Sequence, residues 1–170
     1  MDDTKKRSSI PAKNGRRAPE LNNELVDLES DNWATYLTAA KTLQITENEL
    51  WVLLEVFDAD PPLCQADIAR RIHIPVQTLN SALSKMNRKG WINFVPIPGS
   101  QKAKGVKLTQ AGQKKFHPVL AGIHQAETNA FASLDPEQAR AMLDSIHAYT
   151  LTFQSEMKRL LDTIKSDSDE

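Results

Sequence analysis

The chain lacks several features that would assign it to a function class at once. It holds a single cysteine, Cys64, in 170 residues, which excludes an intrachain disulfide and a cysteine-based zinc cluster. No apolar run approaches the roughly 18 residues that span a bilayer, and the N-terminus has no apolar signal-peptide stretch. A glycine-rich phosphate loop, a Gly-x-Ser-x-Gly elbow and a metalloprotease histidine motif are all missing. We therefore expect a cytoplasmic protein that is no enzyme, needs no cofactor and enters no membrane.

Charge, in contrast, is unevenly distributed along the chain. The protein has 21 basic and 22 acidic residues, for a net charge of -1. Residues 65–107 nevertheless hold eight of the basic residues and one acid, Asp67. A local positive field attracts phosphate polyanions, whereas a balanced surface only keeps a protein soluble. This segregation predicts a nucleic-acid-binding surface on an acidic body.

The two ends of the chain have the composition of tails. Residues 1–20 lack apolar periodicity and mix Lys, Arg, Ser, Pro and Gly, which predicts a flexible basic tail. This tail is either a solvated leader or an arm that reaches along a DNA backbone. Residues 166–170 are predicted to form a short acidic tail.

Residues 46–109 carry the pattern of a helix-turn-helix followed by a hairpin. Thr46 followed by Glu49 is a capping box, which predicts the start of a helix. The segment 58–62 ends with two prolines and predicts the end of that helix.

The next two helices are predicted to be separated by a tight turn at residues 73–75. A short helix over residues 65–72 has Cys64 at its N-cap position. The second helix runs over residues 76–89 and ends at Gly90, since glycine adopts the left-handed conformation that closes a helix.

The second of these helices has an outer face of small polar side chains. Its apolar residues Leu79, Leu83 and Met86 lie on the opposite side. Short side chains permit close approach to a major groove, and amides and hydroxyls read base edges. The predicted reading residues are Gln77, Thr78, Ser81, Ser84 and Lys85.

A hairpin follows this helix. Residues 91–95 alternate and are rich in strand formers, prolines and a glycine at 96–99 predict a turn, and Val106 and Leu108 belong to a returning strand. The loop over residues 99–105 is therefore a predicted wing, and its cations suit a phosphate backbone or a minor groove. The predicted backbone-contacting residues are Arg88, Lys102, Lys104 and Lys107.

Residues 63–112 resemble the winged helix-turn-helix of the MarR family of bacterial transcription regulators. The family's wing signature, Asp-x-Arg-x-x-x-Leu-x-Leu-Thr-x-x-Gly, falls on Ser100, Lys102, Val106, Leu108, Thr109 and Gly112. Ser100 replaces the aspartate and Lys102 the arginine, so we expect phosphate contact more than shape-selective insertion. The resemblance implies a homodimer that binds a double-stranded, pseudo-palindromic operator and responds to a small-molecule effector.

Helical patterns flank the winged lobe on both sides. Residues 21–44 predict a helix, either continuous or interrupted, and residues 110–132 and 135–165 predict two more. The last has apolar residues at every third or fourth position for about thirty residues, a stripe that a lone helix would leave in water. We therefore predict a mainly α fold with a small β wing, in which residues 21–45 and 110–165 form a dimerisation region.

Three further groups of residues have both a functional and a structural interpretation. Cys64 could sense oxidants, or it is a small cap-like residue. His117, His124 and Glu127 share a helix face and could contribute to a metal site, or they are structural; we assign no metal. An effector cleft could be lined by aromatic residues that are otherwise ordinary core: Trp33, Tyr36, Trp51, Phe57 and Phe116.

One alternative function remains open, a winged-helix module that binds protein or RNA. An apolar outer face on the helix over residues 76–89 would favour protein, whereas the polar face that is present favours duplex DNA.

Overall fold

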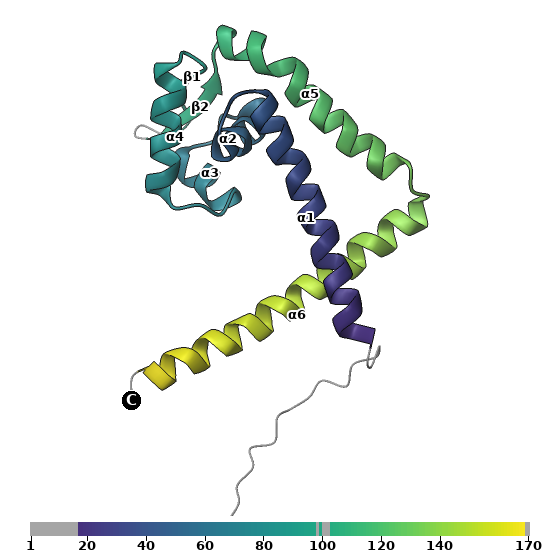
Figure 1. The fold of residues 1–170 in the computed structure, drawn as a ribbon. Helices are drawn as coiled ribbons and strands as arrows, with labels where there is room; N and C mark the ends of the chain where they lie inside the picture. Colours follow the sequence, from purple (N-terminus) through teal and green to yellow (C-terminus); the bar gives the residue numbers. More distant parts are fainter. Residues whose placement is uncertain (1–16, 98, 100–102, 169–170) are drawn as a thin grey trace, which may run out of the picture. The chain divides into compact units, whose positions relative to one another are not determined.

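The computed structural model describes residues 17–97, 99 and 103–168, which form helices and a single antiparallel hairpin (Figure 1). The chain divides into two compact units, residues 1–116 and 117–170. The helices and the hairpin confirm the predicted mainly α fold with a small β wing. The elements in chain order are α1 (Ala18–Thr42), α2 (Glu47–Phe57), α3 (Gln65–Arg71), α4 (Val76–Arg88), β1 (Ile92–Pro96), β2 (Lys104–Leu108), α5 (Gln110–Ala132) and α6 (Pro136–Ser168).

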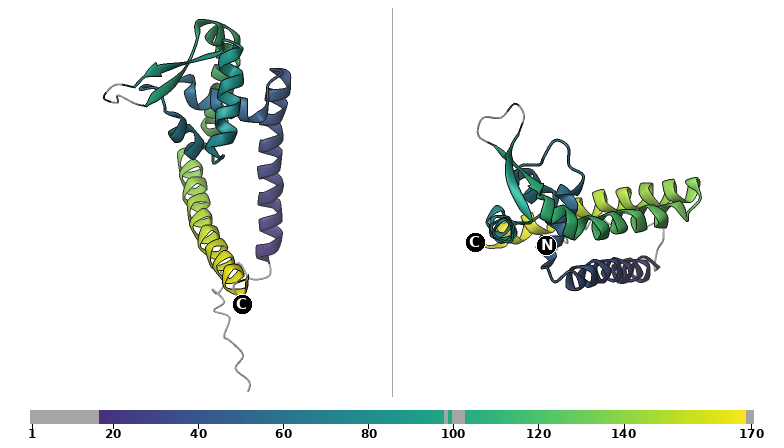
Figure 2. Two further views of the ribbon diagram at one scale, coloured as in Figure 1. Left: turned by 90° about the vertical axis from the view of Figure 1, so that its left-hand side faces the viewer. Right: turned by 90° about the horizontal axis from the view of Figure 1, so that it is seen from above.

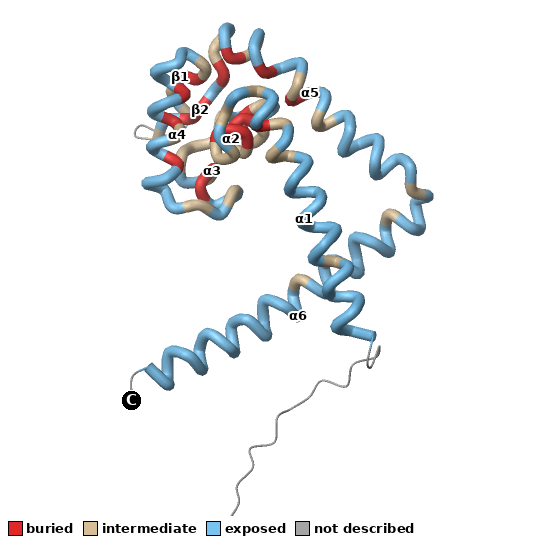
Figure 3. Tube along the Cα trace, viewed as in Figure 1, coloured by how far each residue is buried: buried red, intermediate tan, exposed pale blue. Residues whose placement is uncertain are grey.

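Most of the buried hydrophobic residues lie in the lobe formed by α2, α3, α4 and the hairpin. Helix α2 contacts α4 and β2, α3 contacts α4 and β2, and α4 contacts β1. Each helix buries one face, and the buried segments cluster in this lobe (Figure 3). Its fully buried side chains include Leu50, Leu53, Ile68, Leu79, Leu83, Met86, Ile92 and Val106.

Local capping signals start the helices where the sequence predicts. The Thr46 hydroxyl accepts from the Glu49 amide at 3.3 Å, and the Glu49 carboxylate accepts from the Thr46 amide at 2.7 Å. The Cys64 sulfur caps α3 by accepting from the amide of Asp67 at 3.4 Å. The carboxylate of Asp135 accepts from two amides in the first turn of α6, at 3.0 and 2.9 Å. Each cap satisfies backbone donors that have no partner inside the helix.

Two turns of the lobe use left-handed backbone. Gly90, at φ 70°, ends α4 as predicted, and His73, at φ 53°, lies in the turn between α3 and α4. The Thr109 hydroxyl donates to the carbonyl of Gly90 at 2.6 Å and accepts from the amide of Gly112 at 3.0 Å. Thr109 therefore caps α5, as predicted, and also joins the two ends of the hairpin.

The wing is an antiparallel hairpin in which Ile92 lies opposite Leu108 and Phe94 opposite Val106 (Figure 2). Its base is held against the segment before α3, because the amide of Val106 donates to the carbonyl of Leu63 at 2.9 Å. At Gly105 an added Cβ would lie 2.6 Å from the Cβ of Pro62, so this close approach requires glycine.

The start of α1 and the end of α6 each differ by three residues from the predicted boundary. Helix α1 is continuous and begins at Ala18, so residues 18–20 of the predicted tail are helical. Proline in the first helical turn explains this start, since its missing amide would have no partner there and its φ is already helical. Helix α6 continues to Ser168, past the predicted start of the acidic tail at residue 166. Residues 1–16 and 169–170 of the two predicted tails lie outside the described residues.

The second unit contains the rest of α5 and all of α6. No residue of α6 is buried over its 33 residues, and its large apolar side chains from Met142 to Ile164 are 37–55% exposed. This is the apolar stripe that the sequence predicts. Across the described part of the chain, no helix has the length and apolar character needed to cross a membrane.

Candidate DNA-binding surface

Helix α4 presents an outer face made of short polar side chains. The helix begins directly after Pro75, and its first turn contains no acidic residue. Its inner residues Leu79, Leu83 and Met86 are completely buried. The predicted reading residues are exposed, namely Gln77, Thr78, Ser81, Ser84 and Lys85. A polar helix face of this kind can approach base edges closely.

Lys85 differs from the other predicted reading residues because it is engaged with α2. Its Nζ lies 3.5 Å from Oε1 of Glu49, and Nζ of Lys89 lies 3.4 Å from the same oxygen. Glu49 is only 1% exposed and is the one buried charged residue in the described part of the chain. Two lysines on one flank of α4 are thus anchored to a buried carboxylate of α2.

The surroundings of Glu49 keep it ionised. Burial alone would raise the pKa of its carboxyl group, but the hydrogen bond from the Thr46 amide and the charges of Lys89 and Lys85 outweigh burial and lower that pKa. A buried carboxylate with these partners stays negative at neutral pH. Glu49 therefore acts as a fixed anchor for the flank of α4 that faces α2.

The end of α4 continues into a cluster of cations and aromatic rings. Lys89 Nζ lies 4.0 Å from the ring centroid of Trp91, and Lys115 Nζ lies 4.3 Å from the same centroid. Trp91 also meets Phe116 edge to face, with centroids 4.9 Å apart. Cation–π contacts of this type leave the ammonium groups positioned near the surface.

The structure describes three of the four cations that are predicted to contact the DNA backbone. Arg88 at the end of α4, Lys104 at the start of β2 and Lys107 within β2 are all exposed. Lys102 lies outside the described residues, as does Ser100. The three exposed cations lie on α4 and on the adjoining hairpin, which contact each other directly, so one duplex can meet both elements.

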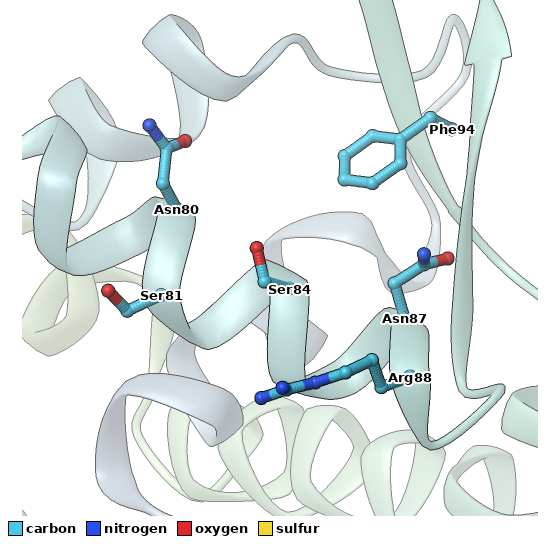
Figure 4. Close-up of a pocket in the computed structure, with 6 residues that line it drawn as sticks. All are labelled: Asn80, Ser81, Ser84, Asn87, Arg88 and Phe94. Carbon is cyan, nitrogen blue, oxygen red and sulfur yellow. The ribbon is translucent and has the colours of Figure 1, made fainter.

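A groove separates the outer face of α4 from β1 (Figure 4). It is a hollow of about 550 Å³, and we call it the α4–β1 groove. Two predicted reading residues, Ser81 and Ser84, border it, as does Arg88. Its complete lining is Asn80, Ser81, Ser84, Asn87, Arg88 and Phe94.

Three of the five aromatic residues predicted for an effector cleft come together. Trp51 lies 5.7 Å from Trp33 and 4.9 Å from Tyr36 between ring centroids. Trp33 and Trp51 line a pocket of about 550 Å³ formed by α1, α2 and the end of α3. Phe57 does not line this pocket, and Phe116 is completely buried against Trp91. The interpretation as ordinary core therefore fits Phe116.

The lining of this pocket also contains charged groups. Trp51 donates through Nε1 to Oε1 of Glu47 at 3.1 Å, and Glu55 pairs with Arg71 at 3.2 Å. His73, in the turn after α3, lies on the same rim. We call this site the aromatic pocket.

Comparison with known proteins identifies the lobe. Residues 51–93 match the family described as winged helix-turn-helix DNA-binding, a range that runs from within α2 into β1. The chain is also 27% identical over 110 residues to the uncharacterized HTH-type transcriptional regulator YybA of Bacillus subtilis (strain 168); the alignment covers 62% of this chain and 72% of YybA.

Solved structures show the same fold. NMB1585, a MarR family regulator from Neisseria meningitidis, is similar at a TM-score of 0.63 and 13% identity, over 81% of this chain and 96% of that one. FabT of Streptococcus pneumoniae, in complex with DNA, is similar at a TM-score of 0.62 and 15% identity, over 81% of this chain and 97% of FabT. Over residues 51–93 the chain therefore matches a DNA-binding winged helix-turn-helix family, and its fold is that of MarR family structures. Its named relatives are regulators, a non-enzymatic class, which confirms the prediction that it is no enzyme.

Of the remaining candidate residues, Cys64 has a local structural role. Besides capping α3, Cys64 donates its thiol proton to the carboxylate of Asp67 at 3.0 Å. His117 and His124 lie on α5, and no group of three or more metal-ligating side chains forms among the described residues.

Four residues of the winged lobe were missed by sequence reasoning. Asn80, Asn87 and Phe94 line the α4–β1 groove, and Glu49 anchors Lys85 and Lys89. The two asparagines could have been found, since they lie four positions before and three positions after Ser84, on one side of a helix of known period. No signal in the sequence connects Glu49 to α4, because its capping role already accounts for it.

Proposed function

We propose that the chain is a transcriptional regulator that binds double-stranded DNA sequence-specifically as a homodimer. The observation that carries the proposal is the outer face of α4, which is exposed, polar and free of acidic residues within a matched winged helix-turn-helix. In this arrangement α4 enters a major groove, and Arg88, Lys104 and Lys107 contact phosphates. We also place Lys102 among these phosphate contacts, from its position in the wing signature.

The homodimer is supported by the apolar stripe of α6. A helix of 33 residues without one buried residue leaves its leucines, phenylalanine and methionines in water. The apolar residues of α1 are exposed as well, including Leu21, Val26, Leu28 and Trp33. Exposed apolar surface of this extent is typical of an interface between subunits. A symmetric pair of chains would carry two α4 helices toward two half-sites of a pseudo-palindrome.

Regulation by a small-molecule effector is supported by the aromatic pocket. Its walls come from α1, α2 and the end of α3, so a bound molecule would contact three helices at once. Helix α2 also carries Glu49, which anchors two lysines of α4. A shift of α2 on ligand binding would therefore be passed to α4. Trp33 and Trp51, which line the pocket, are the proposed ligand-contacting residues, and Tyr36 packs on Trp51.

Gel retardation tests the proposal against its alternative. Duplex fragments of the source genome and structured RNA of matched length are offered to the full chain at several salt concentrations. We expect retention of particular duplexes at nanomolar protein and loss of binding as salt rises. Preference for the RNA, or no retention of either, would contradict the proposal and favour an interaction module. A cytoplasmic location is also part of this proposal, because a regulator that binds bacterial DNA must be in the compartment that contains the DNA.

A further inference from the structure

We propose that Asn80 and Asn87 read A·T base pairs of the operator from the α4–β1 groove, and that Phe94 assists them through contact with thymine methyl groups. This inference rests on the proposed DNA-binding function and specifies where sequence discrimination resides. It assigns that role to the flank of α4 next to β1. The opposite flank, which carries Lys85, holds the helix in place.

The two asparagines have the exposure that base reading requires. Both side chains are exposed, and within the described part of the chain neither amide has a hydrogen-bond partner. They are seven residues apart, so they lie on the same side of α4 and about 10.5 Å apart along its axis. That spacing corresponds to roughly three base-pair steps of 3.4 Å. Ser84 lies between them on the same wall of the groove (Figure 4).

The chemistry of the groove matches an A·T pair. A side-chain amide presents a donor and an acceptor side by side, which pairs bidentately with N6 and N7 of adenine. Phe94 is partly buried on β1 and forms an apolar wall of the same groove. Thymine is the base that displays a methyl group in the major groove, and an apolar ring is a suitable contact for it. Amides and an apolar wall in one hollow therefore favour A·T over G·C.

The other flank of α4 is engaged within the protein. Lys85 and Lys89 share the buried carboxylate of Glu49, at 3.5 and 3.4 Å. A lysine that pairs with a buried carboxylate must break that pair before it can reach a guanine edge, which would leave Glu49 with Lys89 as its only lysine partner among the described residues. Thr78 lies seven residues before Lys85 and so shares its flank. We therefore propose an anchoring role for Lys85, in place of the base-reading role that the sequence predicts.

The test is selection from random duplexes with matched variants. Asn80→Ala and Asn87→Ala are compared with wild type, with Lys85→Ala and with Asn93→Ala, which removes an exposed asparagine of β1 that does not line the groove. We expect each groove variant to lose about 5- to 150-fold in affinity for the selected site and to relax one A·T preference. Asn93→Ala and Lys85→Ala should recover the wild-type motif.

A second variant distinguishes the loss of a contact between Asn87 and a base from a loss of folding. Asn87→Asp keeps the shape of the side chain but can only accept hydrogen bonds, so one preferred adenine should change toward cytosine. Equal thermal unfolding of all variants serves as the folding control. If both groove variants and Asn87→Asp recover the wild-type motif, the inference is overturned while the proposed function stands. If the wild-type protein itself selects no motif, the proposed sequence-specific DNA binding is contradicted, and the inference that rests on it is contradicted as well.

Discussion

The winged lobe and helix α6 use their apolar residues in opposite ways. The lobe buries its leucines, isoleucines and Met86 among α2, α3, α4 and the hairpin. Helix α6 repeats apolar residues with the same helical period, yet none of its residues is buried. The lobe therefore satisfies its own hydrophobic surface, whereas α6 requires a partner surface to do so.

This contrast separates two functions within one short chain. A self-sufficient lobe can present α4 in a fixed orientation, which Glu49 reinforces from α2. An unsatisfied helix instead offers a surface for the second copy that we propose. In the proposed dimer, sequence reading comes from the lobe and symmetry comes from the helices.

The largest expected effect comes from removing most of α6. Deleting residues 141–170 should abolish the proposed dimer and give monomers or aggregates. The deletion removes most of the apolar stripe of α6, so the partner surface has nothing to pack against. Analytical ultracentrifugation measures this directly. A soluble, well-folded dimer from the truncated chain would show that the interface lies elsewhere.

The same substitution in the two regions should have different signatures. Leu83→Ala removes a fully buried side chain and should lower the free energy of unfolding by about 2–5 kcal/mol, since a cavity forms in the lobe. Leu160→Ala, at a position that is 52% exposed in the single chain, should weaken dimerisation instead. Denaturation at several protein concentrations distinguishes them. If Leu160→Ala leaves the concentration dependence unchanged, α6 is not the interface.

Glu49→Gln should destabilise the lobe by about 1–3 kcal/mol at neutral pH, because a buried, charge-paired acceptor is replaced by a neutral one. The pKa of Glu49 is lowered from its usual 4.5 in the folded chain. Its contribution to stability is therefore fully present above the unfolded pKa and is lost as pH falls through the lower folded pKa. The difference between wild type and variant should shrink below about pH 4.5. Urea denaturation at pH 7 and pH 4 checks this, and a difference that grows in acid would contradict the sign.

The smallest effect is expected in the wing. Replacing Lys102 and Lys104 by alanine should weaken binding to specific and nonspecific duplexes alike, because phosphate contacts carry little sequence information. Each lost contact should reduce the salt slope by about one unit. Titrations over a range of salt measure the slope, with Lys114→Ala on α5 as a matched lysine control. An unchanged slope in the double variant would show that the wing does not touch DNA.

Features encoded locally were predictable from the sequence. The caps at Thr46, Cys64 and Asp135 and the helix end at Gly90 are set by residues within one turn, and all four are present. The helical period also separated the buried face of α4 from its exposed face. Period alone could not decide which flank of that exposed face meets α2 and which meets β1.

Features that depend on distant residues were not predictable. Glu49 and Lys89 are 40 positions apart, and either could have faced solvent. The aromatic pocket joins Trp33 to Trp51 across two helices, whereas Phe116 packs on Trp91 instead. The sequence could name the aromatic residues that are candidates for lining an effector cleft. Only the packing in the structure shows which of them line the aromatic pocket and which belong to the core.

The most direct test of a dimer whose lobes read DNA is sequencing of the genomic fragments that the protein retains. The account predicts one enriched motif made of two inverted half-sites, with centres about 10 base pairs apart, since two α4 helices related by a two-fold axis enter successive major grooves. A single unpaired half-site, or retained fragments without a common motif, would contradict it.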